Sequence, residues 1–215
     1  MDKRFRTEGW GGRQPGTSLY HEEIRNRTVG IIGYGHIGKE IAKRAAAFDM
    51  RIIAIRRSQQ DAVAPLDWIG TADQLDKLLS ESDFVVVACD MNETTIGMIG
   101  GRQIAKMKSD SIIINVARGR IIEEESLYNA LKNKKISGAV LDVWYNYIGN
   151  DRENVSPSNL PFEQLDNVIL SAHESASAPE QVERRWKFVA ENICRATEGE
   201  TPKNIVFVGS EEAAD

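Results

Sequence analysis

Three glycines near the start of the chain have the spacing of a phosphate-binding loop. Gly33, Gly35 and Gly38 form the pattern G-x-G-x-x-G in TVGIIGYGHIGKE, between a short apolar run and an amphipathic segment. In a strand–turn–helix unit the first glycine permits a tight turn, the second admits a pyrophosphate, and the third lets helix and strand pack closely. A glycine-rich turn without a ligand is the alternative. The flanking pattern favours dinucleotide binding, with His36 and Ile37 also in contact.

Two adjacent arginines, Arg56 and Arg57, come directly after the next apolar run, RIIAI. They lie 23 and 24 residues after Gly33, where an NAD-binding unit carries an acid for the ribose 2′-hydroxyl. Guanidinium groups instead bind a 2′-phosphate through charge-assisted hydrogen bonds. The pair therefore favours NADP as the cofactor, with NAD as the alternative. Two solvated cations at the end of a strand are the other interpretation.

Six short apolar runs alternate mostly with helical patterns along the chain. The expected strands are 28–33, 51–55, 83–89, 111–117, 137–143 and 167–172, and the expected helices are 38–50, 71–80, 100–107, 123–135 and 179–198. Strands that are apolar on both faces and separated by helices indicate a parallel sheet covered on both sides. We therefore predict an α/β fold, a doubly wound Rossmann-type parallel sheet of six or so strands with helices on both faces. The long stretch 145–166 is typical of a functional loop.

The composition is that of an ordinary globular chain. Of its 215 residues 41% are hydrophobic, and 27 basic against 32 acidic residues give a net charge of −5, which argues against a nucleic-acid surface. Cys89 and Cys194 are too few for a disulfide framework. The N-terminus lacks the apolar core of a signal peptide, and no apolar run approaches the ~20 residues that span a bilayer. We expect a cytoplasmic protein that binds neither nucleic acid nor membrane.

Five segments together resemble the cofactor-binding domain of the D-isomer-specific 2-hydroxyacid dehydrogenases. In order, they are TVGIIGYGHIGKEIAKRAAAF, SDFVVVACDMNETT, INVARGRIIEEESLYNAL, SGAVLDV and NVILSAH. The resemblance implies a dinucleotide-binding domain at 21–207, after a lead-in segment at 1–20 and before a flexible tail at 208–215. It also implies the reduction of small 2-keto acids, or the oxidation of D-2-hydroxy acids, with NAD(H) or NADP(H).

The resemblance also implies roles for three residues at strand ends. Arg118 matches the arginine that binds the substrate carboxylate and carbonyl, and His173 matches the proton donor, so the two supply the cation and the acid that keto-acid reduction needs. Asp142 matches a position near the nicotinamide carboxamide. A surface ion pair for Arg118, an ordinary loop histidine for His173 and a loop cap for Asp142 are the alternatives. Further cofactor contacts are expected at Cys89, Asp90, Thr95, Val116 and Ala117, and at Arg118, Asp142 and His173 themselves.

Three features depart from the family pattern. Tyr147 occupies the position of a Glu that pairs with the histidine, and Glu153, Glu163 and Glu174 are candidate replacements. Asp90 stands where the family has a proline, which puts an acid near the expected cofactor. The substrate domain, commonly ~100 residues or more and mostly N-terminal to the glycine loop, has no counterpart. We therefore expect this chain to bind cofactor but to turn over poorly or not at all.

These departures leave other functions open. A non-catalytic nucleotide-sensing or interaction module of the same fold, similar to the transcriptional corepressors related to this family, would also lack the Glu and the substrate domain. A domain that pairs with a separate polypeptide supplying the substrate wall is a third possibility. The resemblance further implies a homodimer that acts on a small 2-keto or 2-hydroxy acid.

Overall fold

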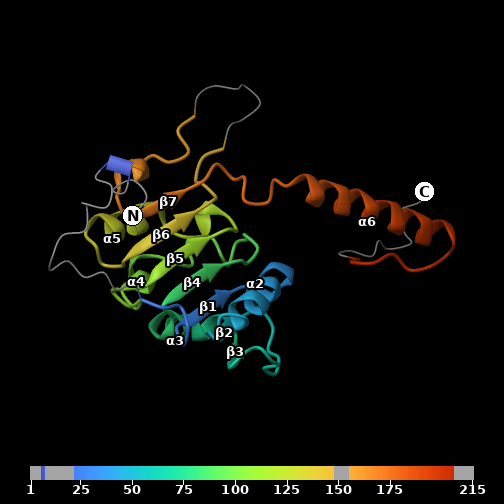
Figure 1. Cartoon of the computed structure of the whole chain (residues 1–215), viewed down its shortest axis with the longest axis horizontal. Coiled ribbons are helices and arrows are strands. Elements are labelled where there is room, and N and C mark those ends of the chain that lie inside the picture. The colour runs from blue at the N-terminus through green and yellow to red at the C-terminus, as the bar shows by residue number, and fades with distance from the viewer. Residues whose placement is uncertain (1–5, 8–21, 148–154, 206–215) are drawn as a thin grey trace.

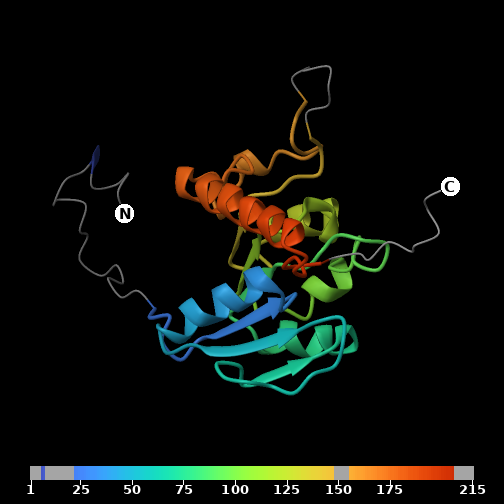
Figure 2. The same ribbon diagram turned by 90° about the vertical axis from the view of Figure 1, so that its right-hand side faces the viewer.

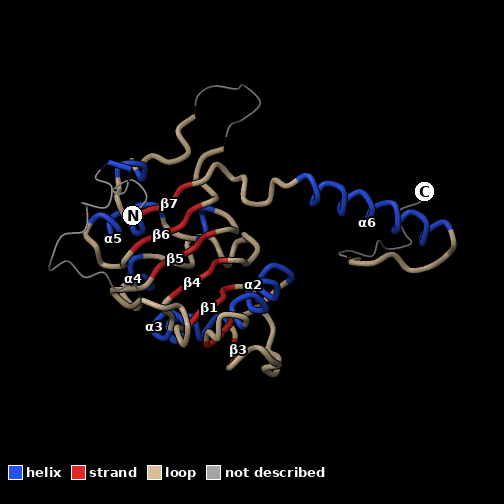
Figure 3. The backbone as a smooth tube through the Cα atoms, in the orientation of Figure 1, coloured by secondary structure: helices blue, strands red, loops and turns tan. Residues whose placement is uncertain are grey.

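A single parallel sheet organises the chain (Figures 1 and 3). The computed structural model describes residues 6–7, 22–147 and 155–205. The seven strands are β1 (Thr28–Ile32), β2 (Arg51–Ile55), β3 (Trp68–Gly70), β4 (Phe84–Val87), β5 (Ile112–Asn115), β6 (Gly138–Leu141) and β7 (Val168–Leu170). They lie in the order β3-β2-β1-β4-β5-β6-β7, and every neighbouring pair is parallel. The predicted doubly wound, Rossmann-type sheet is confirmed.

Helices cover both faces of this sheet (Figure 2). They are α2 (His36–Ala46), α3 (Leu75–Glu81), α4 (Gly101–Ile104) and α5 (Glu124–Lys132), with 3-10 turns at Ala72–Gln74, Gly119–Ile121 and Phe162–Gln164. On one face Ala42 of α2 packs with Ile31 and Ile52. On the other, α3, α4 and α5 enclose the larger core, which includes the fully buried Ile53 and Ile113. Alternate side chains of each strand therefore supply two separate cores.

Strand β3 was not predicted from the sequence. It has three residues, and it extends the sheet by pairing Trp68 with Ile53 and Gly70 with Ile55. Several helix boundaries also differ from the prediction. The helix expected at 38–50 begins at His36 and ends at Ala46, and the one expected at 100–107 is a single turn. Asp49, with φ +53°, has left the helical region, which explains the earlier end of α2.

Helix α6 (Pro179–Thr197) closely matches its predicted range but projects away from the sheet (Figure 1). None of its residues is buried. Val182, Trp186, Val189 and Ile193 form an exposed apolar stripe along it. No helix in the described part of the chain is long and apolar enough to cross a membrane. The predicted tail at 208–215 and nearly all of the lead-in at 1–20 lie outside the described residues.

Candidate functional site

The loop between β1 and α2 has the backbone geometry that the glycine spacing predicts. Gly33 has φ +102°, and a Cβ there would lie 2.5 Å from the backbone nitrogen of Cys89. A Cβ on Gly38 would clash with the carbonyl oxygen of Gly33. Gly35, by contrast, has no atom within 4 Å of its Cβ position, and no side chain caps the helix that follows it. This open, uncapped helix terminus fits the phosphates of a dinucleotide.

A cleft of ≈ 490 Å³ lies beside this loop, at the carboxyl ends of β1, β2 and β4. The structure brings nine predicted cofactor contacts together in its lining: Gly33, Gly35, His36, Ile37, Arg56, Arg57, Cys89, Asp90 and Thr95. Other lining residues were not predicted, among them Tyr34, Ser58, Asn92, Thr94 and Met98. Segments more than fifty residues apart in the sequence therefore form one concave surface.

The two arginines stand on one side of the cleft without an acidic partner among the described residues. Arg56 is half-buried and its Nη1 donates to Oε1 of Gln60. Its backbone N–H donates to the carbonyl oxygen of Gly70, at 3.0 Å, so the unpredicted strand β3 positions it. Arg57 is exposed. Two cations that line a cleft without an acidic partner among the described residues are suited to a phosphate group.

The segment after β4 forms another part of the cleft. The Thr95 hydroxyl donates to the carbonyl oxygen of Asp90 at 2.7 Å and accepts from the N–H of Asn92 at 2.8 Å. The Asp90 side chain is exposed. Burial raises the pKa of the Cys89 thiol to about 11, and the charge of Asp90 adds to this effect. At neutral pH Cys89 is therefore a protonated lining residue, not a nucleophile.

Arg118 follows β5, on a turn that Asn115 holds in place. The Oδ1 atom of Asn115, a residue only 1% exposed, accepts from the N–H of Ala117 at 3.1 Å. Its Nδ2 donates to the carbonyl oxygen of Arg118 at 3.0 Å. The Arg118 side chain is exposed, and its Nη1 donates to the carbonyl oxygen of Ala117 at 2.7 Å. Asn115 was not predicted as part of the site, although a polar residue within the apolar run SIIINVA was its signal.

His173 lies on a turn after β7 that is bound to Asp142. The buried Asp142 carboxylate, directly after β6, accepts from the hydroxyls of Ser171 and Ser175. It also accepts from the backbone N–H groups of Glu174 at 3.0 Å and Ser175 at 3.2 Å. Burial raises the pKa of Asp142, but these hydrogen bonds outweigh it and hold the pKa below its usual value. Asp142 is therefore an anion with its oxygens turned toward the His173 turn.

Tyr147, which the resemblance implied as the replacement for a Glu, lies beside His173. Their rings meet edge-on, with centroids 5.6 Å apart and planes at 60°. The Tyr147 hydroxyl accepts from the N–H of Trp144 at 3.3 Å, and Nε1 of Trp144 donates to the carbonyl oxygen of Ser171 at 2.8 Å. The Tyr147 ring, held by its hydrogen bond to Trp144, therefore packs against the imidazole from the loop after β6.

No carboxylate of the described residues forms an ion pair or hydrogen bond with the His173 side chain. Glu174 contributes its backbone N–H to Asp142, and Glu163 lies in a separate 3-10 turn. Neither Glu163 nor Glu174, two of the three candidate replacements, therefore contacts the His173 side chain by a hydrogen bond or ion pair in the described structure. The third candidate, Glu153, lies outside the described residues.

The remaining predicted residues lie beyond the lining of the cleft. Gly38 packs against the loop and β1. The others follow strands β5, β6 and β7, and they are Val116, Ala117, Arg118, Asp142 and His173. Because parallel strands all end at the same edge, both sets share the carboxyl edge of the sheet (Figure 1). Doubly wound sheets bind their ligands at this edge.

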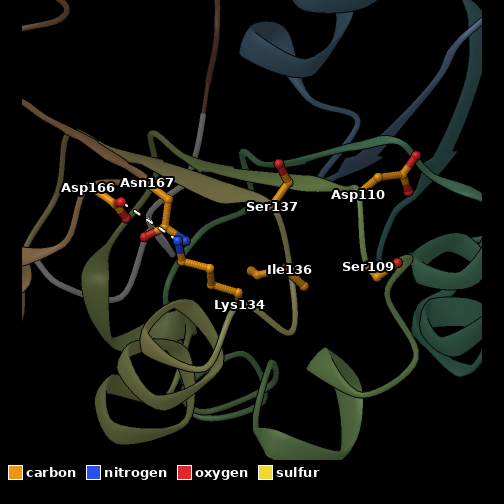
Figure 4. Close-up of a pocket in the computed structure, with 7 residues that line it drawn as sticks. All are labelled: Ser109, Asp110, Lys134, Ile136, Ser137, Asp166 and Asn167. Atoms are coloured by element: carbon orange, nitrogen blue, oxygen red, sulfur yellow. Dashed lines mark ion pairs between the residues drawn. The ribbon is translucent and has the colours of Figure 1, made fainter. Parts of the chain in front are cut away.

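A second cavity, of ≈ 470 Å³, contains none of the predicted residues (Figure 4). Lys134 and Asp166 pair across part of it at 3.7 Å, and both side chains are more than 70% exposed. Such a pair contributes little to stability or to binding. Among the described residues, no three His, Cys, Asp or Glu side chains are grouped as metal ligands.

Known proteins are similar to this chain in sequence and in fold. The family model of the D-isomer specific 2-hydroxyacid dehydrogenase, NAD binding domain, matches residues 1–175. A glyoxylate reductase of Korarchaeum cryptofilum is 37% identical over 187 residues, which cover 86% of this chain and 53% of the relative. A D-3-phosphoglycerate dehydrogenase of Methanocaldococcus jannaschii is 38% identical over 184 residues, 86% of this chain and 34% of the relative. The chain thus spans about half the length of these relatives, or less.

Two solved structures agree with this assignment. D-lactate dehydrogenase with NAD+ from Lactobacillus jensenii superposes with a TM-score of 0.76 at 28% identity, over 95% of this chain and 63% of that one. An acyclic imino acid reductase in complex with NADPH and D-Arg has a TM-score of 0.78 at 27% identity, over 96% and 61%. The chain therefore belongs to the D-isomer specific 2-hydroxyacid dehydrogenase family and carries its NAD-binding domain.

Proposed function

We propose that this chain is the NADP(H)-dependent cofactor-binding part of an oxidoreductase that interconverts small 2-keto acids and D-2-hydroxy acids. The observation that carries the proposal is one cleft that combines the open glycine loop with Arg56 and Arg57. The relatives named glyoxylate reductase, D-3-phosphoglycerate dehydrogenase and D-lactate dehydrogenase support this substrate class. Relatives are solved with NAD+ and with NADPH, so the choice of NADP rests on the two arginines.

The residues of the cleft fit each charged part of the cofactor. Gly35 and the first N–H groups of α2 would hold the pyrophosphate, since the helix terminus is open and uncapped. Arg56 and Arg57 would hold the 2′-phosphate. Asp90 is exposed and its hydrogen-bonded carbonyl oxygen faces Thr95, so its carboxylate is free to remain in solvent. When bound, the nicotinamide supplies or accepts a hydride.

The proposed chemistry uses two side chains at the carboxyl edge. The Arg118 guanidinium binds the substrate carboxylate and orients the keto group, because a planar cation matches a carboxylate through paired hydrogen bonds. His173 donates a proton to the carbonyl oxygen as a hydride reaches the carbonyl carbon, which gives the D-2-hydroxy acid. In the reverse direction His173 takes the hydroxyl proton as the hydride leaves.

We further propose that this chain alone binds cofactor but turns over poorly. This chain covers 53% and 34% of two relatives. An active-site cleft that only one domain lines admits water and positions a substrate weakly. A homodimer is part of the proposal, and a monomeric mass by sedimentation equilibrium at micromolar concentration would contradict it.

Single-turnover reduction of glyoxylate, with the protein in excess over NADPH, tests the assigned roles. We expect Arg118→Ala and His173→Ala to slow the reaction by roughly 100-fold or more, because each removes a group that acts in the transition state. Arg120→Ala is the matched control, since Arg120 is also exposed and lies two residues from Arg118. Equal rates in all of these variants would refute the roles of Arg118 and His173.

A second candidate function is a non-catalytic nucleotide-sensing module. It is favoured by the aromatic contact of His173 with Tyr147 and by the lack of a carboxylate partner among the described residues. This function predicts NADPH binding that survives Arg118→Ala and His173→Ala, with no single turnover in the wild type even when a complete form of the protein is assayed. Detectable turnover that both substitutions abolish would exclude it.

A further inference from the structure

The turn that carries His173 has an unfavourable backbone conformation. His173 has φ +59°, in the left-handed region that non-glycine residues rarely adopt. Such a conformation is unfavourable for a residue with a side chain and persists only where surrounding contacts impose it. The residues on either side of His173 must therefore be held by interactions strong enough to fix the turn.

Those interactions come from one buried carboxylate. Oδ1 of Asp142 accepts from the Ser171 hydroxyl before His173 and from the Glu174 N–H after it. Oδ2 accepts from the Ser175 hydroxyl, and the Ser175 N–H points at both oxygens, at 3.2 and 3.4 Å. A carboxylate accepts about four hydrogen bonds, so the turn fills this capacity. Bonds to a charged acceptor are about twice as strong as neutral ones.

We infer that Asp142 is a positioning residue that holds the His173 turn in its left-handed conformation, and that Ser175 is its principal partner. The inference deepens the proposed function and rests on it for the catalytic meaning of His173. It goes beyond the expectation that Asp142 lies near the nicotinamide carboxamide, because it assigns the carboxylate a role in holding the turn of His173.

The other side of the turn is closed by Trp144 and Tyr147. Nε1 of Trp144 donates to the carbonyl oxygen of Ser171, and the Tyr147 ring lies against the imidazole. Neither residue bonds to Glu174 or Ser175 in the described structure, so the part of the turn after His173 depends on Asp142. Loss of that carboxylate should therefore release this part of the turn while the aromatic contacts remain.

The test is amide hydrogen exchange and the backbone coupling of His173, measured by NMR on the isotope-labelled chain. In Asp142→Ala we expect the amides of Glu174 and Ser175 to exchange about tenfold faster or more, because bonds to a buried charge are lost. The N–H to Hα coupling of His173 should leave the value of the left-handed region. Ser175→Ala should give a smaller change in the same direction, and Ser175→Thr, which keeps the hydroxyl, should restore the wild-type values.

Asp166→Asn is the matched control, since it alters an aspartate that is 81% exposed and should change neither readout. Wild-type exchange and coupling in a folded Asp142→Ala would overturn the inference. If that variant does not fold, the contrast between Ser175→Ala and Ser175→Thr decides, and identical spectra around His173 would overturn it.

Cofactor binding and turnover separate this inference from the proposed function. Ser175→Ala should slow single-turnover glyoxylate reduction while NADPH affinity stays within about twofold, as expected for a group that acts through His173. Weaker NADPH binding by Ser175→Ala with an unchanged turn would show that Ser175 serves the cofactor and not the turn, and would overturn the inference. A turn that loosens as predicted while His173→Ala leaves the rate unchanged would support the inference and refute only the catalytic role of His173.

Discussion

At the scale of single residues, the three glycines of the G-x-G-x-x-G pattern have different structural surroundings. A side chain on Gly38 would collide with the backbone of the loop, whereas one on Gly35 would enter open space. Gly38 is therefore needed for the close packing of the loop, whereas the open space at Gly35 is consistent with the proposed phosphate contact. The sequence pattern predicted all three positions, but the separation of their roles depends on coordinates.

This contrast predicts that one alanine substitution lowers stability and the other weakens NADPH binding. Gly38→Ala should lower the free energy of unfolding by about 1–3 kcal/mol, because the added methyl overpacks the loop. Gly35→Ala should lower it by less than about 1 kcal/mol, since φ is −92° and only a helix-cap preference is lost. It should weaken NADPH binding about tenfold or more by obstructing the phosphates. Urea titration and fluorescence titration measure the two effects; equal destabilisation by both substitutions would contradict this division.

The parts of the site that sequence predicted are those whose role depends on local pattern. The glycine loop and Arg56 follow from spacing within one strand–helix–strand unit. Asn115 was missed, and the loop-capping role of Asp142 was only an alternative, because each depends on hydrogen bonds that form only after the chain folds. The donors to Asp142 lie about thirty residues away in the sequence.

At the scale of elements, Asp83 connects the segments that precede β4 and β5 with the first residue of β1. Its carboxylate accepts from the N–H of Thr28 at 2.7 Å and from Nζ of Lys108 at 2.8 Å, with Arg27 at 3.6 Å. Burial raises its pKa, but the bonds from Lys108 and Thr28 outweigh it, so the pKa is lowered on folding. The anion is therefore bound more favourably in the folded chain than in the unfolded one.

This pKa shift predicts an acid-dependent loss of stability. Because the folded pKa lies below the unfolded value of about 3.9, the stabilisation is present above that pH and is lost as pH falls through the folded pKa. Asp83→Asn should cost about 1–3 kcal/mol at pH 7, and this difference from the wild type should shrink below about pH 4. Asp166→Asn should change stability by less than about 0.5 kcal/mol. Urea unfolding across pH would contradict the account if the Asp83→Asn difference did not depend on pH.

Most elements were predictable because each apolar run is long enough to show its own periodicity. Strand β3 was not, since three residues following a loop carry no pattern, and only their pairing with Ile53 and Ile55 makes them a strand. Helix α6 was predicted with nearly its observed ends. Its position away from the sheet could not be, because the apolar stripe of Val182 and Trp186 resembles that of a helix packed on a core.

At the scale of the whole molecule, the strand order is what creates the site. The β1–α2 loop, the end of β2 and the segment after β4 meet because β2, β1 and β4 are neighbours in the sheet. Chain order alone would place β3 between β2 and β4. The crossover after β3 instead carries β4 to the other side of β1, and the cleft lies where the strand order reverses.

The most direct test of the central claim is titration of this chain with NADPH and NADH separately, by nucleotide fluorescence. We predict that NADPH binds at least about tenfold more tightly, because two guanidiniums meet its 2′-phosphate. Arg56→Ala/Arg57→Ala should abolish that preference by weakening NADPH and leaving NADH nearly unchanged, whereas an Arg120→Ala control should retain it. NADH binding as tight as that of NADPH to the wild type would contradict the account.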